Sequence, residues 1–167
     1  MPANQTTADA RLVEGKPEYR TRPLTVECRA TLNSAANFNI LVASDTKDSA
    51  DHWELYSYAG SGVFSLYQPG RGGEFKSDVN ICDGQPHLFA AVIEPERVRL
   101  FVDGKLVADA PATPRQGEPI PGGLAFGQLV EGTIGCDCVV EEVRLSSGVR
   151  DLANVSAGPL PAFRPRF

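Results

Sequence analysis

The chain has 167 residues, of which 42% are hydrophobic and 22% are charged, and its formal net charge is −5. A single domain of this size buries about 70% of the surface that its unfolded chain exposes, so it can fold around one core without disulfides. The acidic balance argues against nucleic acid as a partner, because phosphate binding needs a basic surface. No apolar run approaches the roughly 20 residues of a membrane-spanning helix, so membrane insertion is not expected.

The first 20 residues are polar apart from the pair Leu12 and Val13, and we expect them to add an edge strand or to stay mobile. They lack the charged and apolar regions of a signal peptide. From residue 21 to residue 150, short β-type runs recur about every 8 to 12 residues between Gly-rich turns, which is typical of a sandwich or jelly roll. The expected strands cover residues 23–32, 38–44, 53–59, 62–68, 77–82, 87–94, 97–103, 105–109, 123–127 and 138–146.

Two proline-rich stretches interrupt this pattern. Residues 110–123 are too rich in proline for a helix or a central strand and are predicted to form a surface loop. Residues 151–167 are predicted to be a strap lying on the domain or the start of a linker. No segment shows a sustained helical period.

The clearest turn signals surround two adjacent hydrophobic runs, residues 88–93 and 98–102. Between them, Glu94-Pro95-Glu96-Arg97 is a hairpin connection in which proline sets φ for a turn. After the second run, Asp103-Gly104 supplies the residue pair with positive φ that a tight hairpin requires. Three consecutive antiparallel strands are therefore predicted.

This arrangement, with an Asp-Gly-x-x-His entry at 83–87 and Val-Arg-Leu-Phe-Val-Asp-Gly-Lys at 98–105, resembles the core hairpins of laminin G-like domains. These domains belong to the concanavalin A-like lectin and glucanase superfamily. Residues 24–32 and 139–146 are similar to its first and last long strands, so the resemblance covers roughly residues 20 to 150. It implies an all-β fold, a two-sheet antiparallel β-sandwich of the concanavalin A-like jelly-roll type, in which those two strands are neighbours. One scaffold hosts lectins, hydrolases and adhesion modules, so the resemblance specifies fold more than activity.

The four cysteines, which permit three complete pairings, are Cys28, Cys82, Cys136 and Cys138. Cys28 lies on the apolar side of its strand, as expected of a buried free thiol. The resemblance also allows a disulfide from Cys28 to Cys136 or Cys138, because the first and last strands would be side by side. A zinc site is not expected, since the two histidines are far apart in sequence.

Catalysis is not expected. The glucanase branch of the superfamily carries Glu-x-Asp-x-x-Glu on one strand, which directs an acid and a nucleophile at the same sugar. That triplet does not occur in the chain. A Gly-x-Ser-x-Gly elbow is also missing.

Aromatic residues near the third expected strand suggest ligand binding. Sugars stack their C–H faces on aromatic rings, and this region holds the only tryptophan. Trp53 alternates with Tyr56 and Tyr58, so one set must pack into the sandwich, and Trp53 can equally be a core residue. The exposed set would then be Tyr56 and Tyr58, with Tyr67 and Arg71 as neighbours.

The resemblance adds a calcium hypothesis. In many relatives an acidic residue in the last strand binds calcium, and this position matches Glu141. Relatives usually have aspartate there, and the extra methylene of glutamate moves the carboxylate relative to the ion. The alternative is an ordinary surface glutamate. Arg29 is expected to pair with Glu27 or Glu142 on a solvated face.

Three aspartates at i, i+3 spacing precede the tryptophan, at positions Asp45, Asp48 and Asp51. They resemble a calcium loop only loosely, because they lack the alternating oxygen positions of an EF-hand. We expect a solvated acidic turn.

These observations together predict a non-catalytic module that binds carbohydrate or a glycosylated protein, as part of a larger extracytoplasmic protein that is secreted, periplasmic or on the cell surface. The alternative is a structural protein–protein interaction domain that binds no sugar, and a third possibility is a glycoside hydrolase. An open aromatic face would favour the first function, and a face covered by loops the second.

Overall fold

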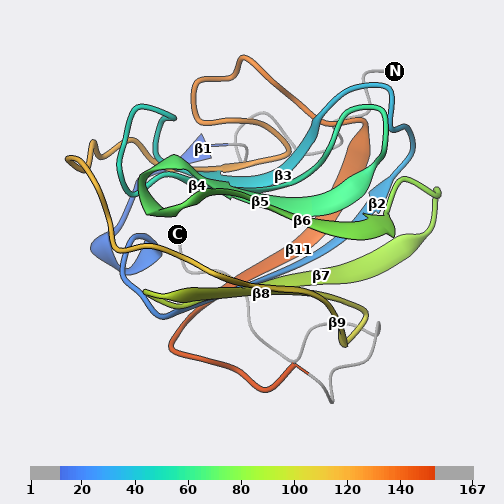
Figure 1. Ribbon diagram of the computed structural model, residues 1–167. Helices are drawn as coiled ribbons and strands as arrows, with labels where there is room; N and C mark the ends of the chain where they lie inside the picture. Colours follow the sequence, from blue (N-terminus) through green and yellow to red (C-terminus); the bar gives the residue numbers. More distant parts are fainter. Residues whose placement is uncertain (1–11, 153–167) are drawn as a thin grey trace.

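The computed structural model describes residues 12–152, which form two antiparallel sheets stacked face to face (Figure 1). The six-stranded sheet has the order β1-β10-β3-β4-β5-β6, and the five-stranded sheet has the order β11-β2-β7-β8-β9. The predicted all-β sandwich is therefore confirmed. The strands are β1 (Leu12–Val13), β2 (Leu24–Leu32), β3 (Asn39–Ser44), β4 (Trp53–Ser57), β5 (Val63–Gln68), β6 (Gly73–Asn80), β7 (Pro86–Ile93), β8 (Arg97–Val102), β9 (Lys105–Pro111), β10 (Leu124–Phe126) and β11 (Cys138–Ser147).

Two single-turn 3-10 helices complete the described chain, η2 (Pro17–Tyr19) and η3 (Pro69–Arg71). Neither has the length and apolarity needed to cross a membrane. The N-terminal residues 1–11 and the strap or linker expected at 153–167 lie outside the described residues.

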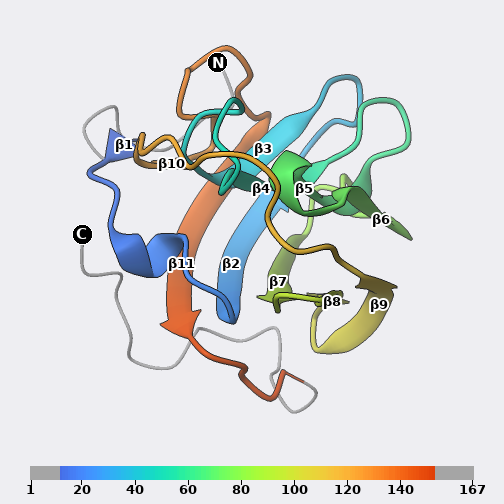
Figure 2. The same ribbon diagram turned by 60° about the vertical axis from the view of Figure 1, so that its left-hand side comes forward.

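The first and last long strands are neighbours, as predicted. β2 lies between β11 and β7, and its pairing with β11 runs from Leu32 opposite Cys138 to Leu24 opposite Ser147. Figure 2 shows β11 and β2 side by side in the five-stranded sheet. The pairing is irregular between Val140 and Glu142. Such a bulge changes the direction in which the following side chains point.

Both predicted hairpin turns are present. The amide of Glu94 donates to the Arg97 carbonyl over 2.9 Å and closes the turn between β7 and β8. Asp103 and Gly104 have φ of 50° and 81°, so the β8–β9 turn has two consecutive residues in the left-handed region.

The core lies between the sheets and contains the tryptophan. Trp53 is completely buried in the main hydrophobic cluster, and its indole N–H donates to the carbonyl of Tyr19 over 2.8 Å. Phe64 on β5 and Phe89 on β7 connect the two sheets, with ring centroids 5.3 Å apart. Trp53 is thus a core residue, and the interpretation of it as a sugar platform is wrong, because the inward side of β4 faces the opposite sheet.

The cysteines pair locally. Cys136 and Cys138 form a disulfide, whereas Cys28 and Cys82 are free thiols. The suggested disulfide from Cys28 to β11 is wrong, because the register sets Cys28 opposite Val143. The buried free thiol expected at Cys28 is confirmed, and burial raises its pKa above the usual value.

The sandwich continues past residue 150. Arg150 pairs with the buried Glu27 over 3.2 Å, and Leu152 packs against Ala90, Val92 and Phe101 on the outer face of the five-stranded sheet. The described end of the chain therefore lies against this sheet, below it in Figure 1.

Candidate functional site

The outer face of the six-stranded sheet carries the aromatic residues that the sequence predicted for binding. Because β4 alternates, Trp53 and Leu55 point into the core while Tyr56 points outward. Tyr56 belongs to a separate apolar cluster on this outer face, against which Tyr58 and Tyr67 pack. The structure thus brings the three predicted tyrosines together.

This face is partly covered. Leu129, from the segment between β10 and β11, belongs to the same cluster as Tyr56, and Ile134 from that segment packs against the cluster. Tyr56 is only 2% exposed. Burial, together with the nearby carboxylates of Glu74 and Glu54, raises the pKa of Tyr56. Tyr58 and Tyr67 remain half-buried. The exposed ligand surface expected at Tyr56 is therefore wrong, because Tyr56 is buried in a cluster that includes Leu129 from outside the strands, which the alternation pattern does not show.

An aromatic pair borders the covered region. Phe38 is 37% exposed and lies edge-on to Tyr58, with ring centroids 5.0 Å apart. The ammonium of Lys76 lies 3.3 Å from the centroid of the Tyr58 ring. Phe38 did not enter the predicted site, although an aromatic residue at the first position of the strand expected over 38–44 was the available signal. We call Phe38, Tyr58 and Lys76 the aromatic site.

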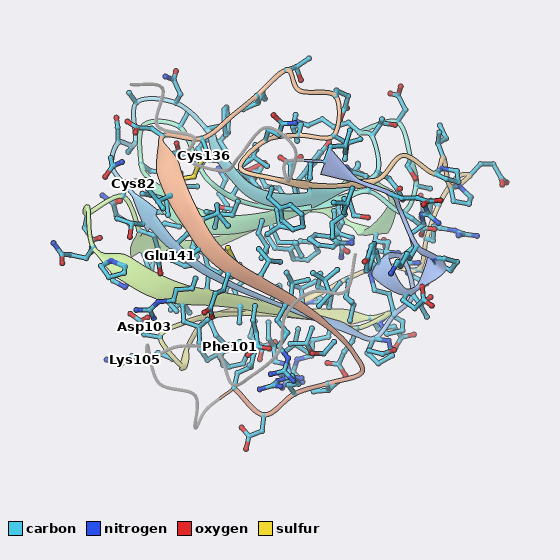
Figure 3. The ribbon with its side chains drawn as sticks, turned by 180° about the vertical axis from the view of Figure 1, so that it is seen from behind. Cys82, Phe101, Asp103, Lys105, Cys136 and Glu141 are labelled. Atoms are coloured by element: carbon cyan, nitrogen blue, oxygen red, sulfur yellow. A yellow bond between two sulfur atoms is a disulfide. The ribbon has the colours of Figure 1, made fainter. Side chains whose placement is uncertain are left out.

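An open cleft of about 540 Å³ adjoins the aromatic site, and Phe38 forms part of its wall. Asn39 is fixed in this wall, because its amide donates to the Ser34 carbonyl over 2.7 Å and its side-chain oxygen accepts from the Asp137 amide over 2.7 Å. Cys136 also lines the cleft. Figure 3 shows Cys136 and Cys82 near the same end of the sandwich, and Asn39 approaches the Cys82 sulfur at 3.7 Å.

The cleft and the aromatic site together offer an aromatic face beside amide, hydroxyl and carboxylate groups. Rings of this kind stack on the C–H faces of sugars, and fixed polar groups hydrogen-bond sugar hydroxyls. The cleft also lies within the size range of small-ligand pockets.

The carboxylates nearest this face are engaged in contacts. Glu54 is buried, with His52 Nε2 at 2.7 Å and Lys47 Nζ at 3.8 Å. Glu74 pairs with Lys76 over 3.1 Å. In the sheet register Glu54 and Glu74 lie on either side of Tyr67, so they are two strands apart. Each carboxylate also has a partner already, His52 for Glu54 and Lys76 for Glu74.

Arg71 lies elsewhere. It follows β5, at the end of the β4–β5 hairpin opposite to Tyr58, and its guanidinium pairs with Asp51 over 3.2 Å. The structure therefore does not bring Arg71 together with the aromatic site.

The solvated acidic turn expected for the three aspartates is wrong for two of them, because Asp45 and Asp51 are buried in ion pairs with arginines from other turns. Asp48 is exposed.

Glu141 lies on the surface of β11, where Figure 3 labels it, and its carboxylate pairs with Arg29 over 3.0 Å. Glu141 is thus a partner of Arg29 that the sequence did not predict, while Glu142, one of the two expected partners, lies opposite Arg29 in the sheet register. The other, Glu27, is buried and pairs with Arg150, so the solvated face expected there is wrong. Residues 12–152 contain no group of three histidine, cysteine or acidic side chains arranged to hold a metal. One oxygen of the Glu141 carboxylate already pairs with Arg29, and this residue alone does not make a calcium site, so calcium binding there stays a prediction.

Known structures share this fold. A putative carbohydrate-binding protein from Bacteroides ovatus is similar over 92% of this chain and 46% of its own, with 13% identity and a TM-score of 0.65. The CBM40 module of a Ruminococcus gnavus IT-sialidase, bound to α2,3-sialyllactose, matches over 87% of this chain and 96% of its own, with 10% identity and a TM-score of 0.61.

The LG4-5 domains of the mouse laminin α1 chain match over 76% of this chain and 36% of their own, with 19% identity and a TM-score of 0.55. No protein-family model and no curated protein sequence matches the chain. The predicted two-sheet jelly-roll sandwich is therefore confirmed as the fold, and it is a fold that the laminin LG4-5 domains share.

Proposed function

We propose that this chain is a non-catalytic carbohydrate-binding module, and that it binds sugar at the aromatic site and the adjoining cleft. The observation that carries the proposal is the edge-on pair of exposed Phe38 and half-buried Tyr58, beside a cleft whose polar wall is fixed by Asn39. A sugar ring could stack on this pair while its hydroxyls reach the cleft. Tyr67 and Lys47, whose ammonium lies 5.4 Å from the Tyr67 centroid, extend the same face.

The similar structures support a carbohydrate ligand, since two of the three are named for carbohydrate binding. Their shared fold does not by itself set the ligand of this chain. We propose that the partner is a glycan, free or on a glycosylated protein, that the module acts outside the cytoplasm, and that it is part of a larger protein.

A non-catalytic role is supported by the local chemistry. A retaining glycosidase needs two carboxyl groups about 5 to 5.5 Å apart, one of them free to act as nucleophile. Glu54 and Glu74 are separated by the intervening strand β5 and have partners of their own. We therefore expect no release of reducing sugar from common polysaccharides, and sustained turnover abolished by Glu54→Gln or Glu74→Gln would contradict this role.

A glycan array probed with the folded chain, with and without calcium, tests the function. Binding to a defined group of glycans is expected. If no glycan is bound under either condition, the structural interaction domain becomes the better explanation of the half-covered face.

A further inference from the structure

A second hollow lies at the end of the β4–β5 hairpin opposite to Tyr58. It measures about 520 Å³ and is lined by residues of the η2 and η3 regions and of the loop after β9. We call it the arginine groove, because four arginines line it, namely Arg20, Arg22, Arg71 and Arg115. The whole chain carries a net charge of −5, so a cluster of positive side chains is not a simple result of composition.

Two buried aspartates hold three of these arginines in place. Arg20 Nε lies 2.8 Å from Asp45, whose side chain is 1% exposed. Arg71 and Arg115 share the two oxygens of Asp51, at 3.2 and 3.1 Å. Guanidinium groups stay protonated at all ordinary pH values, so four positive charges face two negative ones among the described residues. The groove therefore retains an excess of positive charge.

Arg22 has no carboxylate partner among the described contacts. One of its terminal nitrogens donates to the Arg20 carbonyl over 2.7 Å, and the other lies 3.5 Å from the Gln68 side-chain oxygen. Its Nε is buried and makes no hydrogen bond within residues 12–152, and the same holds for Nε of Arg71. Burial and the neighbouring Arg71 lower the pKa of Arg22 to about 10, so it remains charged at neutral pH.

These two Nε atoms are closed to solvent, so a ligand in the groove would meet the exposed parts of Arg20, Arg71 and Arg115, whose side chains are 16%, 13% and 41% exposed. The excess positive charge that they present calls for an anionic partner. An oxyanion fits this need, because planar guanidinium groups donate to carboxylate and sulfate oxygens in pairs. The aspartates orient the arginines before the ligand arrives, which lowers the ordering cost of binding. Prolines 17, 95, 119 and 121 line the groove as well and stiffen its backbone.

We infer that the arginine groove binds the carboxylate or sulfate group of an acidic saccharide. That an oxyanion binds follows from the groove itself, whereas its attachment to a sugar rests on the proposed function. The arginine groove and the aromatic site lie at opposite ends of the β4–β5 hairpin, so the two sites contact different parts of a long glycan or bind separate ligands.

Calorimetric titration of the whole chain tests the inference. The probes are a chondroitin sulfate tetrasaccharide, its desulfated form and neutral chitotetraose, so that sulfate and carboxylate are distinguished. The variants are Arg22→Gln and Arg115→Gln, with Arg97→Gln as the matched control, because Arg97 does not line the groove and pairs with Asp109 of β9. We expect each groove variant to weaken binding of an acidic probe at least tenfold and the control to leave it unchanged, since a hydrogen bond to a charged group is worth about that much.

The inference is overturned if neither acidic probe binds, if both groove variants bind like the wild type, or if Arg97→Gln weakens binding equally. Should Arg22→Gln fail to fold, Arg115→Gln decides, because its side chain is 41% exposed on a loop. Tyr58→Ala separates this inference from the proposed function. Acidic-probe binding that survives in Tyr58→Ala but not in Arg115→Gln supports the groove even if the aromatic site binds no sugar.

Discussion

Single residues in this sandwich are constrained mostly by backbone geometry and by charge partners. The Asp103-Gly104 turn could be predicted because positive φ leaves few residue choices. The partners of the buried aspartates could not be predicted, because Arg20, Arg71 and Arg115 come from three separate turns. Nothing in the local pattern around Asp45 and Asp51 reports on those turns.

Replacing Gly104 tests the turn. Gly104→Val places a β-branched residue at φ 81°, and we expect the free energy of unfolding to fall by about 1 kcal/mol or more. Chemical denaturation measures the change. Lys105→Val, at the exposed neighbouring position in β9, is the control and should have a small effect. An unchanged midpoint for Gly104→Val would mean that the turn tolerates other geometries.

His87 should make stability depend on pH. Its ring nitrogens lie 2.6 Å from Asp103 and 2.9 Å from Asp83. Burial lowers the pKa of His87, but the hydrogen bonds and charges of the two carboxylates raise it by more. The net shift of the pKa is therefore upward from 6.5. Because the pKa is higher in the folded than in the unfolded state, protonated His87 stabilises the folded protein. This stabilisation is fully present below pH 6.5 and is lost as pH rises through the folded pKa.

We therefore expect His87→Asn to destabilise the domain more at pH 5.5 than at pH 9, measured as the difference in free energy of unfolding from the wild type. An equal loss at both pH values would show that protonated His87 contributes no extra stability.

Calcium binding at Glu141 is tested by thermal unfolding. If an ion binds there, calcium at about a hundred times its dissociation constant should stabilise the fold by about 2.7 kcal/mol. Glu141→Ala should remove that gain, and Glu142→Ala, at the next position of β11, should keep it. Equal melting temperatures in chelator and in excess calcium would remove the metal and leave Glu141 as the partner of Arg29.

At the scale of elements, the alternation of apolar residues predicted all but one of the long strands to within two residues. β6 is the exception, because it begins at Gly73, four residues before the expected start. Gly73 and Glu74 have little intrinsic strand preference, yet they pair with Gln68 and Tyr67 of β5. Pairing with an existing strand thus overrode local propensity.

Trp53 connects two elements, because its indole on β4 donates to the Tyr19 carbonyl at the end of η2. Trp53→Phe keeps an aromatic ring in the core and removes this bond, so we expect the free energy of unfolding to fall by roughly 1 to 3 kcal/mol. Since Trp53 is the only tryptophan and is fully buried, wild-type fluorescence should also stay unchanged when glycan is added. Quenching of Trp53 by a bound glycan would contradict its place in the core.

For the whole molecule, the sequence pattern and the resemblance predicted the two-sheet sandwich and the pairing of its first and last long strands. The ligand surface was predicted only in part. Tyr58 and Tyr67 lie on the expected face, but Tyr56 is buried in a cluster with the loop residue Leu129. Phe38 comes from the β2–β3 connection, with its ring 6.0 Å from that of Tyr56. The packing of loops from distant parts of the chain determines how exposed these aromatic side chains are. The alternation of residues within one strand carries no information about that packing.

Titration of the strongest array glycan into the wild type, Tyr58→Ala, Phe38→Ala and Leu106→Ala tests the central claim, that the aromatic site binds sugar. Leu106 is a matched exposed apolar side chain on β9 of the other sheet, 52% exposed. We predict that Tyr58→Ala and Phe38→Ala each weaken binding about tenfold or more, in line with the loss of aromatic stacking, while Leu106→Ala binds like the wild type. Wild-type affinity in both aromatic variants would contradict the claim.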